Sequence, residues 1–450
     1  MRMFLAVTVC KILKFLLGII GRGSSLPGEI ALKLYPDVLK KVQLPPLVIA
    51  VTGSNGKTST VEMIAHTMRS AGKTVVWNEK GSNQIAGITC IILSECNAKG
   101  KMKADALLLE TDERYAKHSF RHFAPTHYVI TNLYRDQLTR NAHHEWVYED
   151  VKKGIREEST LIINADDPLV SLYGFGKDNT IWFGMDKQDF STDRNTGIYD
   201  DGKYCPNCKK PMKYDYYHYN HIGSYCCENC GHKKNDTAYT VTRADLDNGV
   251  ITINDKYDIK LAFRSIYNVY NILAAFSICS IAGIDGDFIS KCISNYILKN
   301  GRVVQYRLGE TKGTFLLSKH ENSVSYDRSL EYIVRQKQEC AVIIIVDSIS
   351  RRYSTGETSW LWDIDFGMLD KDYIKRIYLL GKHAKDLELR FSFTGIDSSR
   401  LIVNESIDEG IDAAAKINHG KLYTVTCFSD KHKFLPKVEI IKSEDTKEVE

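Results

Sequence analysis

The segment Gly53–Ser59 (GSNGKTS) combines glycines, a lysine and hydroxyl residues in the order expected of a phosphate-binding loop. Glycines let backbone N–H groups close around phosphate oxygens, and a helix that follows offers its positive N-terminus. Lys57 would then reach the terminal phosphates, and Thr58 would ligate magnesium. The spacing matches only the short G-x-x-G-K-T core, so a turn with a chance lysine is the alternative. The apolar run before it and the amphipathic pattern after it favour nucleotide binding.

Carboxylates follow two further apolar runs. Glu110 ends the run that begins at Ala106, and a carboxylate at a strand end beside a phosphate loop is well placed for magnesium. The neighbouring Asp112 and Glu113 are interpreted as surface loop acids. Asp136 either orients metal or substrate or caps a helix.

Four of the twelve cysteines form two CxxC pairs, Cys205 with Cys208 and Cys227 with Cys230. Two such knuckles at this separation are typical of a zinc ribbon. Four thiolates close the coordination sphere, so the predicted zinc is structural. Cys226 is a rival to Cys227 as a ligand. Paired CxxC elements among scattered apolar cysteines indicate a reducing compartment and not a disulfide framework.

Two other groups of residues give weaker indications. Asp363 and Asp365 lie among aromatic residues in SWLWDIDF, either as exposed acids on a packed strand or as a functional carboxylate. No cysteine lies in a G-x-C-x-G elbow, so no glutaminase nucleophile is evident. Four histidines show no convincing ligand pattern and are interpreted as polar surface: His143, His144, His218 and His221.

Strands that alternate with helices must position these groups. The pattern predicts a doubly wound, parallel α/β sheet whose ligand groups lie at the carboxyl ends of its strands. The predicted amphipathic helix over 58–71 directly follows the phosphate loop. Apolar, strand-like runs occur at 47–51, 74–77, 106–109, 128–131 and 161–163.

The chain has 450 residues, enough for two or three domains. A helical segment over 1–45 is expected to precede an ATP-binding domain over 46–300 that carries the zinc-ribbon insertion at about 200–236. A smaller α/β domain is expected over 301–450. The formal net charge of +4 does not favour nucleic-acid binding.

The first helix is apolar from Met3 to Ile20 but is interrupted by Lys11 and Lys14. Its uninterrupted apolar run is too short to span a bilayer. The amphipathic pattern favours packing on the protein over lying on a membrane surface, which is the alternative.

Several segments together resemble the Mur ligases and the folylpolyglutamate synthases. These segments are GSNGKTS at 53–59, TNLYRDQLTR at 131–140, NADDP at 164–168, SIYNVYNILAA at 265–275 and GR at 301–302. The ribbon, an N-terminal SSLPGEIALKLYPDVL and the late SWLWDIDF are narrower features. With them the chain resembles the MurT family, the ligase-like subunits of lipid II isoglutaminyl synthase.

This resemblance implies an ATP-dependent carbon–nitrogen ligase that phosphorylates the α-carboxyl of D-glutamate in the peptidoglycan stem peptide. Ammonia would come from a GatD-like glutamine amidotransferase in a heterodimer, at the cytoplasmic face of the membrane. Asp363, or failing that Asp365, would complete the partner's cysteine–histidine triad. Asn268 would lie near the adenine and Arg302 near the nucleotide. ATP and Mg²⁺ would be bound by Gly53, Asn55, Gly56, Lys57, Thr58, Ser59 and Glu110.

The chain also departs from the family pattern. Gln137 replaces the histidine of amino-acid-adding Mur ligases, which suits the MurT branch. SKHENS at 318–323 stands where N-P-x-G is usual, and Val304 replaces the acid of the linker G-R-x-E. These changes suggest a divergent paralogue with an altered acceptor or a weakened activity. An amino-acid-adding ligase and a non-catalytic nucleotide-binding subunit are the remaining alternatives.

Overall fold

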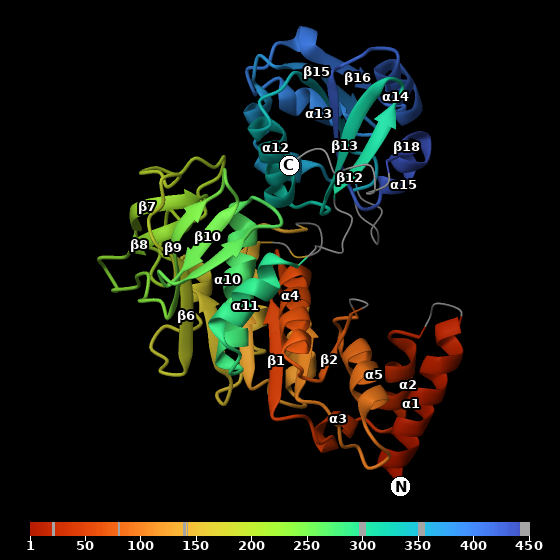
Figure 1. Cartoon of the computed structure of the whole chain (residues 1–450), viewed down its shortest axis with the longest axis vertical. Helices are drawn as coiled ribbons and strands as arrows, with labels where there is room; N and C mark the ends of the chain where they lie inside the picture. Colours follow the sequence, from red (N-terminus) through yellow and green to blue (C-terminus); the bar gives the residue numbers. More distant parts are fainter. Residues whose placement is uncertain are drawn as a thin grey trace. The chain divides into compact units, whose positions relative to one another are not determined.

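The computed structural model describes residues 1–19, 23–79, 82–137, 141, 143–296, 303–349 and 356–441 (Figure 1). The chain divides into two compact units. The first comprises Met1–Tyr134 and His143–Leu298, and the second comprises Arg135–Ala142 and Lys299–Glu450.

A nine-stranded sheet forms the centre of the first unit, in the order β11-β10-β9-β6-β5-β4-β1-β3-β2. The strands from β2 to β9 pair in parallel, whereas β9, β10 and β11 pair antiparallel. The predicted doubly wound parallel sheet is therefore confirmed, with an antiparallel extension at one edge. The strands are β1 (Leu47–Thr52), β2 (Val75–Trp77), β3 (Ala106–Glu110), β4 (His127–Ile130), β5 (Thr160–Asn164), β6 (Thr180–Met185), β9 (Tyr239–Asp245), β10 (Val250–Ile253) and β11 (Tyr257–Lys260).

The central strands are buried on both faces because helices cover the sheet. All five residues of β3 are buried, which explains their near-continuous apolar sequence. Helix α4 packs against β1, β3 and α10, and α10 also contacts α11 (Figure 1). The helices of this unit that follow the first strand are α4 (Lys57–Ser70), α5 (Ile85–Glu95), α6 (Ala116–Phe120), α8 (His144–Lys152), α9 (Pro168–Ser171), α10 (Ile266–Ile281) and α11 (Gly286–Ser294).

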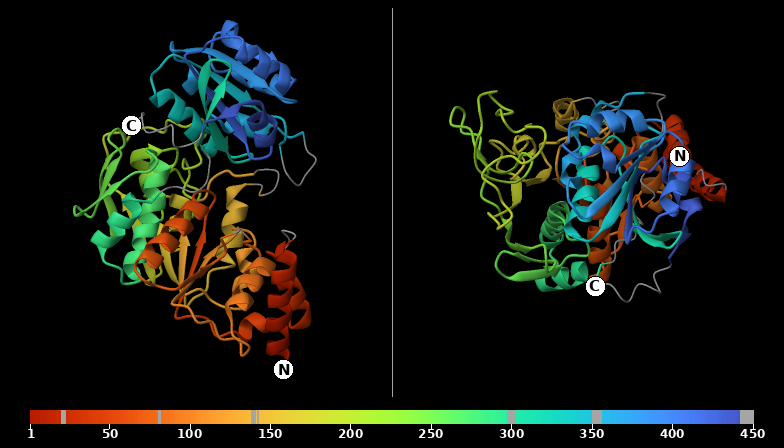
Figure 2. Two further views of the ribbon diagram at one scale, coloured as in Figure 1. Left: turned by 45° about the vertical axis from the view of Figure 1, so that its right-hand side comes forward. Right: turned by 90° about the horizontal axis from the view of Figure 1, so that it is seen from above.

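An N-terminal group of helices packs together beside β2 (Figure 2). It comprises α1 (Arg2–Ile19), α2 (Leu26–Leu34), α3 (Val38–Lys41) and α5. Helix α1 buries only Ala6, Val7 and Cys10. Within the described residues, the structure holds no helix whose length and apolarity suit a membrane crossing.

The cysteine-containing insertion lies between β6 and β9. It includes a separate two-stranded antiparallel sheet, β7 (Lys213–Tyr219) and β8 (Ile222–Cys226). Buried charges attach this insertion to the main sheet. Lys234 Nζ lies 2.8 Å from Asp166 Oδ1, and Tyr270 on α10 donates to Asp166 Oδ2 at 2.7 Å.

The second unit contains a seven-stranded sheet in the order β16-β15-β14-β17-β13-β12-β18. The strands from β13 to β16 pair in parallel, and β12 and β18 form an antiparallel edge. The strands are β12 (Val303–Leu308), β13 (Thr311–Ser318), β14 (Cys340–Ile345), β15 (Ile374–Leu380), β16 (Leu401–Asn404), β17 (Lys421–Cys427) and β18 (Glu439–Ile440).

Helices cover this second sheet, and two 3₁₀ turns form the aromatic segment SWLWDIDF. That segment is not the packed strand considered from sequence: it forms η1 (Ser359–Asp363) and η2 (Phe366–Leu369). The alternation of apolar residues imitates a strand, but Trp360, Leu361 and Phe366 pack into the core from these turns. The remaining helical elements are α12 (Ser323–Arg335), α13 (Ala384–Phe391), η3 (Ser398–Arg400), α14 (Ile407–Ala415), α15 (Lys431–Phe434) and η4 (Leu435–Lys437).

Candidate functional site

The phosphate-loop sequence joins β1 to α4, at the carboxyl edge of the main sheet. Gly53 has φ +143° and Gly56 has φ +84°, conformations that favour glycine. A Cβ atom on Gly53 would lie 2.2 Å from Thr131 Oγ1, and one on Gly56 would lie 1.9 Å from Asn271 Oδ1. The loop thus brings its backbone close to its neighbours and ends at the N-terminus of α4, where Lys57, Thr58 and Ser59 form the first turn.

The segment after β4 supports the loop by hydrogen bonds. The Asn55 backbone N–H donates to Asn132 Oδ1 at 2.8 Å, and Asn132 Nδ2 donates to the Asn55 carbonyl at 3.0 Å. Ser54 Oγ accepts from the Tyr134 N–H at 2.9 Å. This mutual bonding fixes the loop before any ligand binds.

Lys57 points back over the loop and not into solvent. Its Nζ donates to the Gly53 carbonyl and lies 3.1 Å from both carboxylate oxygens of Glu113. The interpretation of Asp112 and Glu113 as surface acids was wrong, because they are only 5% and 4% exposed. Asp112 bonds the Arg114 N–H at 3.0 Å within the turn that leads into α6, and this turn directs Glu113 to Lys57.

Glu110 is the last residue of β3 and is buried. It pairs in register with Val51 on β1, so it lies one strand away from the start of the loop. Asn78 holds its backbone through two hydrogen bonds of 2.8 Å. The phosphate loop and the predicted magnesium carboxylate therefore share one edge of the sheet.

Helix α10 begins beside the loop. Ser265 caps it, and Asn268 is buried in its first turn with Nδ2 bonded to the Phe263 carbonyl at 3.0 Å. Asn271, one turn later, is the residue that contacts Gly56. Sequence reasoning named Asn268 and missed Asn271, although the repeated asparagine in SIYNVYNILAA was an available indication. Arg302 lies outside the described residues.

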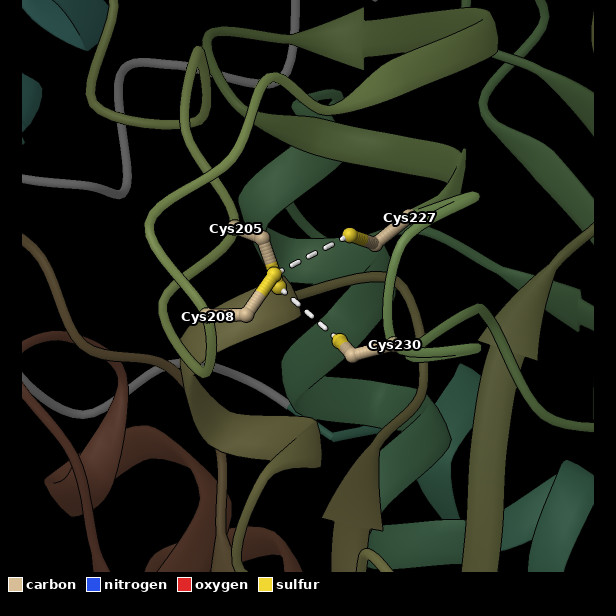
Figure 3. Close-up of side chains that lie close together, drawn as sticks. All are labelled: Cys205, Cys208, Cys227 and Cys230. Carbon is tan, nitrogen blue, oxygen red and sulfur yellow. Dashed lines mark hydrogen bonds between the residues drawn. The ribbon is translucent and has the colours of Figure 1, made fainter.

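The four cysteines of the two CxxC pairs gather in one place (Figure 3). Cys205 Sγ lies 3.6 Å from Cys230 Sγ, and Cys208 Sγ lies 3.4 Å from Cys227 Sγ. A tetrahedral zinc with bonds of about 2.3 Å would space its sulfurs by about 3.8 Å, close to these values. A backbone hydrogen bond from Lys210 lowers the pKa of Cys208 to about 6. The group can hold a metal ion, and it contains Cys227 and not Cys226.

The interpretation of four histidines as polar surface was wrong for three of them. His144, His218 and His221 are buried, and His143 is exposed. Burial lowers the pKa of His218, whose Nδ1 lies 3.0 Å from Ser191 Oγ. The tertiary fold of the insertion covers these side chains, and spacing along the chain gives no sign of that.

The second unit contains the predicted Asp363 and its alternative, Asp365. Arg135 Nη1 donates to Asp363 Oδ1 at 2.9 Å. Asp365 donates its backbone N–H to Asp327 Oδ1 at 2.8 Å. Trp362, between them, is 42% exposed. The segment thus places a partly buried carboxylate, paired with Arg135, beside an exposed indole.

Asp136 is buried in the same unit. Lys319 pairs with one of its carboxylate oxygens, and Asn322 Nδ2 donates to the other at 2.8 Å. Both partners come from the unusual segment SKHENS at 318–323, so this segment has a structural role. Residues 138–140, where a helix capped by Asp136 would begin, lie outside the described residues.

A parallel sheet with a glycine-rich loop after β1, followed by a second α/β unit, is the architecture of the Mur ligases. The family model of the Mur ligase middle domain matches residues 51–231, and that of the MurT ligase C-terminal domain matches residues 319–430. The chain belongs to the MurT family, because it is 31% identical to a curated MurT subunit over 94% of its length.

Curated relatives and solved structures agree with this assignment. The lipid II isoglutaminyl synthase subunit MurT of Staphylococcus aureus (strain N315) is 31% identical and aligned over 94% of each chain. That of Streptococcus pneumoniae (strain ATCC BAA-255 / R6) is 28% identical over 96% of each chain. The fold is similar to a pseudomurein peptide ligase type C from Methanothermus fervidus, with TM-score 0.64, 21% identity and coverage of 87% and 78%. MurF from Acinetobacter baumannii gives TM-score 0.62, 14% identity and coverage of 90% and 79%.

Proposed function

We propose that this chain is the ATP-dependent subunit of a lipid II isoglutaminyl synthase. It activates the α-carboxyl of D-glutamate in the peptidoglycan stem peptide as an acyl phosphate, and ammonia then converts that carboxyl to an amide. The observation that supports this most directly is the loop Gly53–Ser59, with Lys57 and Glu110 at the same sheet edge, in a chain of the MurT family.

The loop fits a nucleotide phosphate on structural grounds. A Cβ atom at Gly53 or Gly56 would collide with Thr131 or Asn271, so both positions require glycine, as in loops whose backbone N–H groups bind phosphate. The N-terminus of α4 adds backbone N–H groups that suit an anion. Gly53, Asn55, Gly56, Lys57, Thr58 and Ser59 would hold ATP, and Thr58 and Glu110 would hold Mg²⁺. When bound, Mg²⁺ supplies positive charge that neutralises phosphate oxygens during transfer.

The reaction has two balanced steps. A carboxylate oxygen attacks the γ-phosphorus of ATP, and ADP leaves. Ammonia nitrogen then attacks the acyl carbon, inorganic phosphate leaves, and the nitrogen loses a proton. Lys57 contributes charge where negative charge develops, while the rigid loop keeps the phosphates in place.

We infer that the four cysteines bind a structural zinc ion. Four thiolates leave no open position for substrate. Cys205–Cys208 and Cys227–Cys230 lie on either side of the hairpin β7–β8, so the ion would tie the two ends of this hairpin together.

We infer that the ammonia comes from a GatD-like glutamine amidotransferase bound as a second subunit. The chain has no cysteine in a glutaminase elbow, so it needs such a source. Trp362 is a large exposed side chain next to Asp363, and aromatic residues of this kind anchor protein interfaces. Asp363 would orient the histidine of the partner's cysteine–histidine pair.

We also infer that α1 contacts the membrane surface, where a lipid-linked substrate resides. The exposed side of α1 presents large apolar residues, among them Phe15 at 74% exposure. Arg2, Lys11 and Lys14 lie on the same helix, which contains no acidic residue. An apolar face with basic neighbours suits anionic lipid headgroups.

Vesicle binding tests this contact. The chain should sediment with vesicles that contain phosphatidylglycerol and less with phosphatidylcholine alone. Phe15→Asp should abolish the difference, whereas Leu389→Asp, at a similarly exposed leucine on α13, should preserve it. Equal sedimentation of both variants would refute a specific role for α1.

Co-expression with a glutamine amidotransferase tests the main proposal. The complex should convert lipid II to its amidated form with ATP and glutamine, and Lys57→Ala should slow the conversion strongly. Failure of the wild-type complex to exceed the Lys57→Ala complex would exclude the proposal. Turnover with a free amino acid and no partner would instead indicate an amino-acid-adding ligase. ATP binding without acceptor-dependent turnover would indicate a non-catalytic subunit.

A further inference from the structure

A cavity of about 500 Å³ lies beside the cysteine cluster, outside the phosphate site. Three segments that are distant in sequence form it. The start of α8 contributes His143 and His144, the insertion contributes Asp201, and the turn of the hairpin β7–β8 contributes His221. The fold therefore brings several imidazole and carboxylate groups together around one cavity.

Three of these groups lie close enough to share an ion. His143, His144 and Asp201 each offer one ligand atom, and these atoms lie within 4.8 Å of one another. His144 Nδ1 lies 3.8 Å from Asp201 Oδ2, and the rings of His143 and His144 have centroids 4.1 Å apart. A bound zinc ion lies about 2.0–2.2 Å from each nitrogen or oxygen ligand. A small rotation of these side chains would therefore bring the three ligand atoms to bonding distance of one ion. His143 is exposed, so burial does not restrict the rotation of its ring, and among the described residues rotation would break only the 3.4 Å hydrogen bond that its Nδ1 accepts from the Glu145 N–H.

His221 gives a second indication that the cavity receives a ligand. Its side chain is 4% exposed and lines the cavity, and Nδ1 has no hydrogen-bond partner among the residues that the structure describes. A buried imidazole nitrogen without a partner is costly, and a bound ligand or its water would satisfy it. On its other side, His221 Nε2 lies 3.9 Å from Asp167 Oδ1.

The charge of the lining favours a cation. Lys209 contributes the positive charge, but its Nζ lies 2.7 Å from Glu145 Oε1. The lining has three carboxylates, Glu145, Asp200 and Asp201, against this one lysine, so it carries a net negative charge when the histidines are neutral. Imidazole and carboxylate together select divalent transition metals over Mg²⁺, which prefers oxygen ligands alone.

We propose that His143, His144 and Asp201 form a second metal site, for a divalent ion of the Zn²⁺ or Co²⁺ type. Three protein ligands would leave coordination positions open, and His221 lines the same cavity. This site differs in kind from the four-thiolate cluster, which is closed. The proposal does not depend on the ligase activity.

Metal loading of the full chain tests the proposal. After removal of metals, Co²⁺ titration should fill the cysteine cluster, with thiolate-to-cobalt charge-transfer absorption, and then a second site that adds only ligand-field absorption. His144→Ala and Asp201→Asn should each weaken the second site by more than ~10-fold and leave the charge-transfer absorption unchanged. His432→Ala, at an exposed histidine on α15, is the matched control and should bind as the wild type does.

The two kinds of Co²⁺ absorption distinguish the two sites, so each outcome either supports or overturns the proposal. Loss of the second equivalent in both cavity variants supports the proposal. A wild-type chain that binds a single equivalent overturns it, as do cavity variants that still bind two. If His144→Ala does not fold, as judged by circular dichroism, the isosteric Asp201→Asn decides alone.

Discussion

Lys57 Nζ lies 3.1 Å from both carboxylate oxygens of Glu113, and both side chains are largely buried. The lysine that is expected to contact the terminal phosphates therefore forms an ion pair with a glutamate at the same edge of the sheet when no nucleotide is bound. Removal of one member of such a pair leaves the other charge in a poorly solvated place.

We predict that Lys57→Ala lowers the amidation rate by about 10²–10³-fold, the loss typical of a single lost electrostatic contact to a transition state. The variant should also unfold at lower temperature, because Glu113 loses its lysine. The double variant Lys57→Ala with Glu113→Gln should recover thermal stability without recovering activity. Calorimetry and the amidation assay measure the two effects separately. Recovery of both would assign Lys57 a purely structural role.

We predict that Gly56→Ala abolishes ATP binding and destabilises the chain. Two effects lower the free energy of unfolding of this variant. Alanine is strained in the left-handed backbone conformation at φ +84°, and its Cβ would lie 1.9 Å from Asn271 Oδ1. Gly72, at the other end of α4, is the matched control because it has φ +79° but nothing within 4 Å. Gly72→Ala should lower the free energy of unfolding by about 1–3 kcal/mol, and this variant should still bind ATP as the wild type does. Urea unfolding and ATP titration compare the two, and equal effects would refute the contact with Asn271.

The sheet of the first unit was predictable because its strands are buried on both faces and read as apolar runs between helical patterns. The cysteine cluster was predictable because two CxxC pairs at this separation are typical of a single four-cysteine site. The burial of Glu113 was not predictable. It depends on a contact with Lys57, and the two residues follow different strands, β3 and β1, which only the folded sheet places side by side. The same holds for His144 and His221, which only the folded insertion brings together.

We predict that Cys205→Ser removes one bound zinc per chain and lowers the stability of the insertion. Removal of a thiolate breaks a closed tetrahedral site, whose binding free energy contributes to folding. Cys226→Ser is the matched control, because Cys226 lies in β8 next to a proposed ligand but outside the four-cysteine group. Elemental analysis after dialysis measures the zinc. Equal zinc loss in both variants would contradict the assignment of Cys227 as the ligand.

We predict that Asp327→Asn stabilises the chain at neutral pH. Desolvation, and then the charges of Asp365, Glu331 and Asp363, raise the pKa of Asp327 well above its ordinary value of 3.8. The folded state thus binds this proton more tightly than the unfolded state, so the ionised carboxylate opposes folding above the raised pKa. Asparagine keeps an acceptor for the Asp365 N–H and removes the charge.

The pH profile distinguishes this effect from a general one. The advantage of Asp327→Asn over the wild type should be absent below the ordinary pKa of 3.8 and grow as the pH rises from there towards the raised pKa. Urea unfolding at a series of pH values measures the difference. Asp412→Asn, at an exposed aspartate of α14, should show no such trend. A difference that does not vary with pH would mean that packing, and not charge, causes the effect.

We predict that Asp363, and not Asp365, supports the glutaminase of the partner subunit. Asp363 lies beside the exposed Trp362, whereas the Asp365 backbone is bonded to Asp327 within the unit. If Asp363 orients the partner's histidine, Asp363→Asn should lower glutamine hydrolysis by the complex by up to about 10⁴-fold, the loss seen when a triad aspartate becomes asparagine. ATP binding should not change, because Gly53–Ser59 is untouched. Asp365→Asn is the control, and its complex should hydrolyse glutamine at nearly the wild-type rate. If Asp365→Asn instead loses more activity than Asp363→Asn, then Asp365 is the residue that supports the glutaminase. Size-exclusion chromatography must show that both variants still bind the partner, since a loss of assembly in Asp363→Asn would make this carboxylate an interface contact and not a member of the triad.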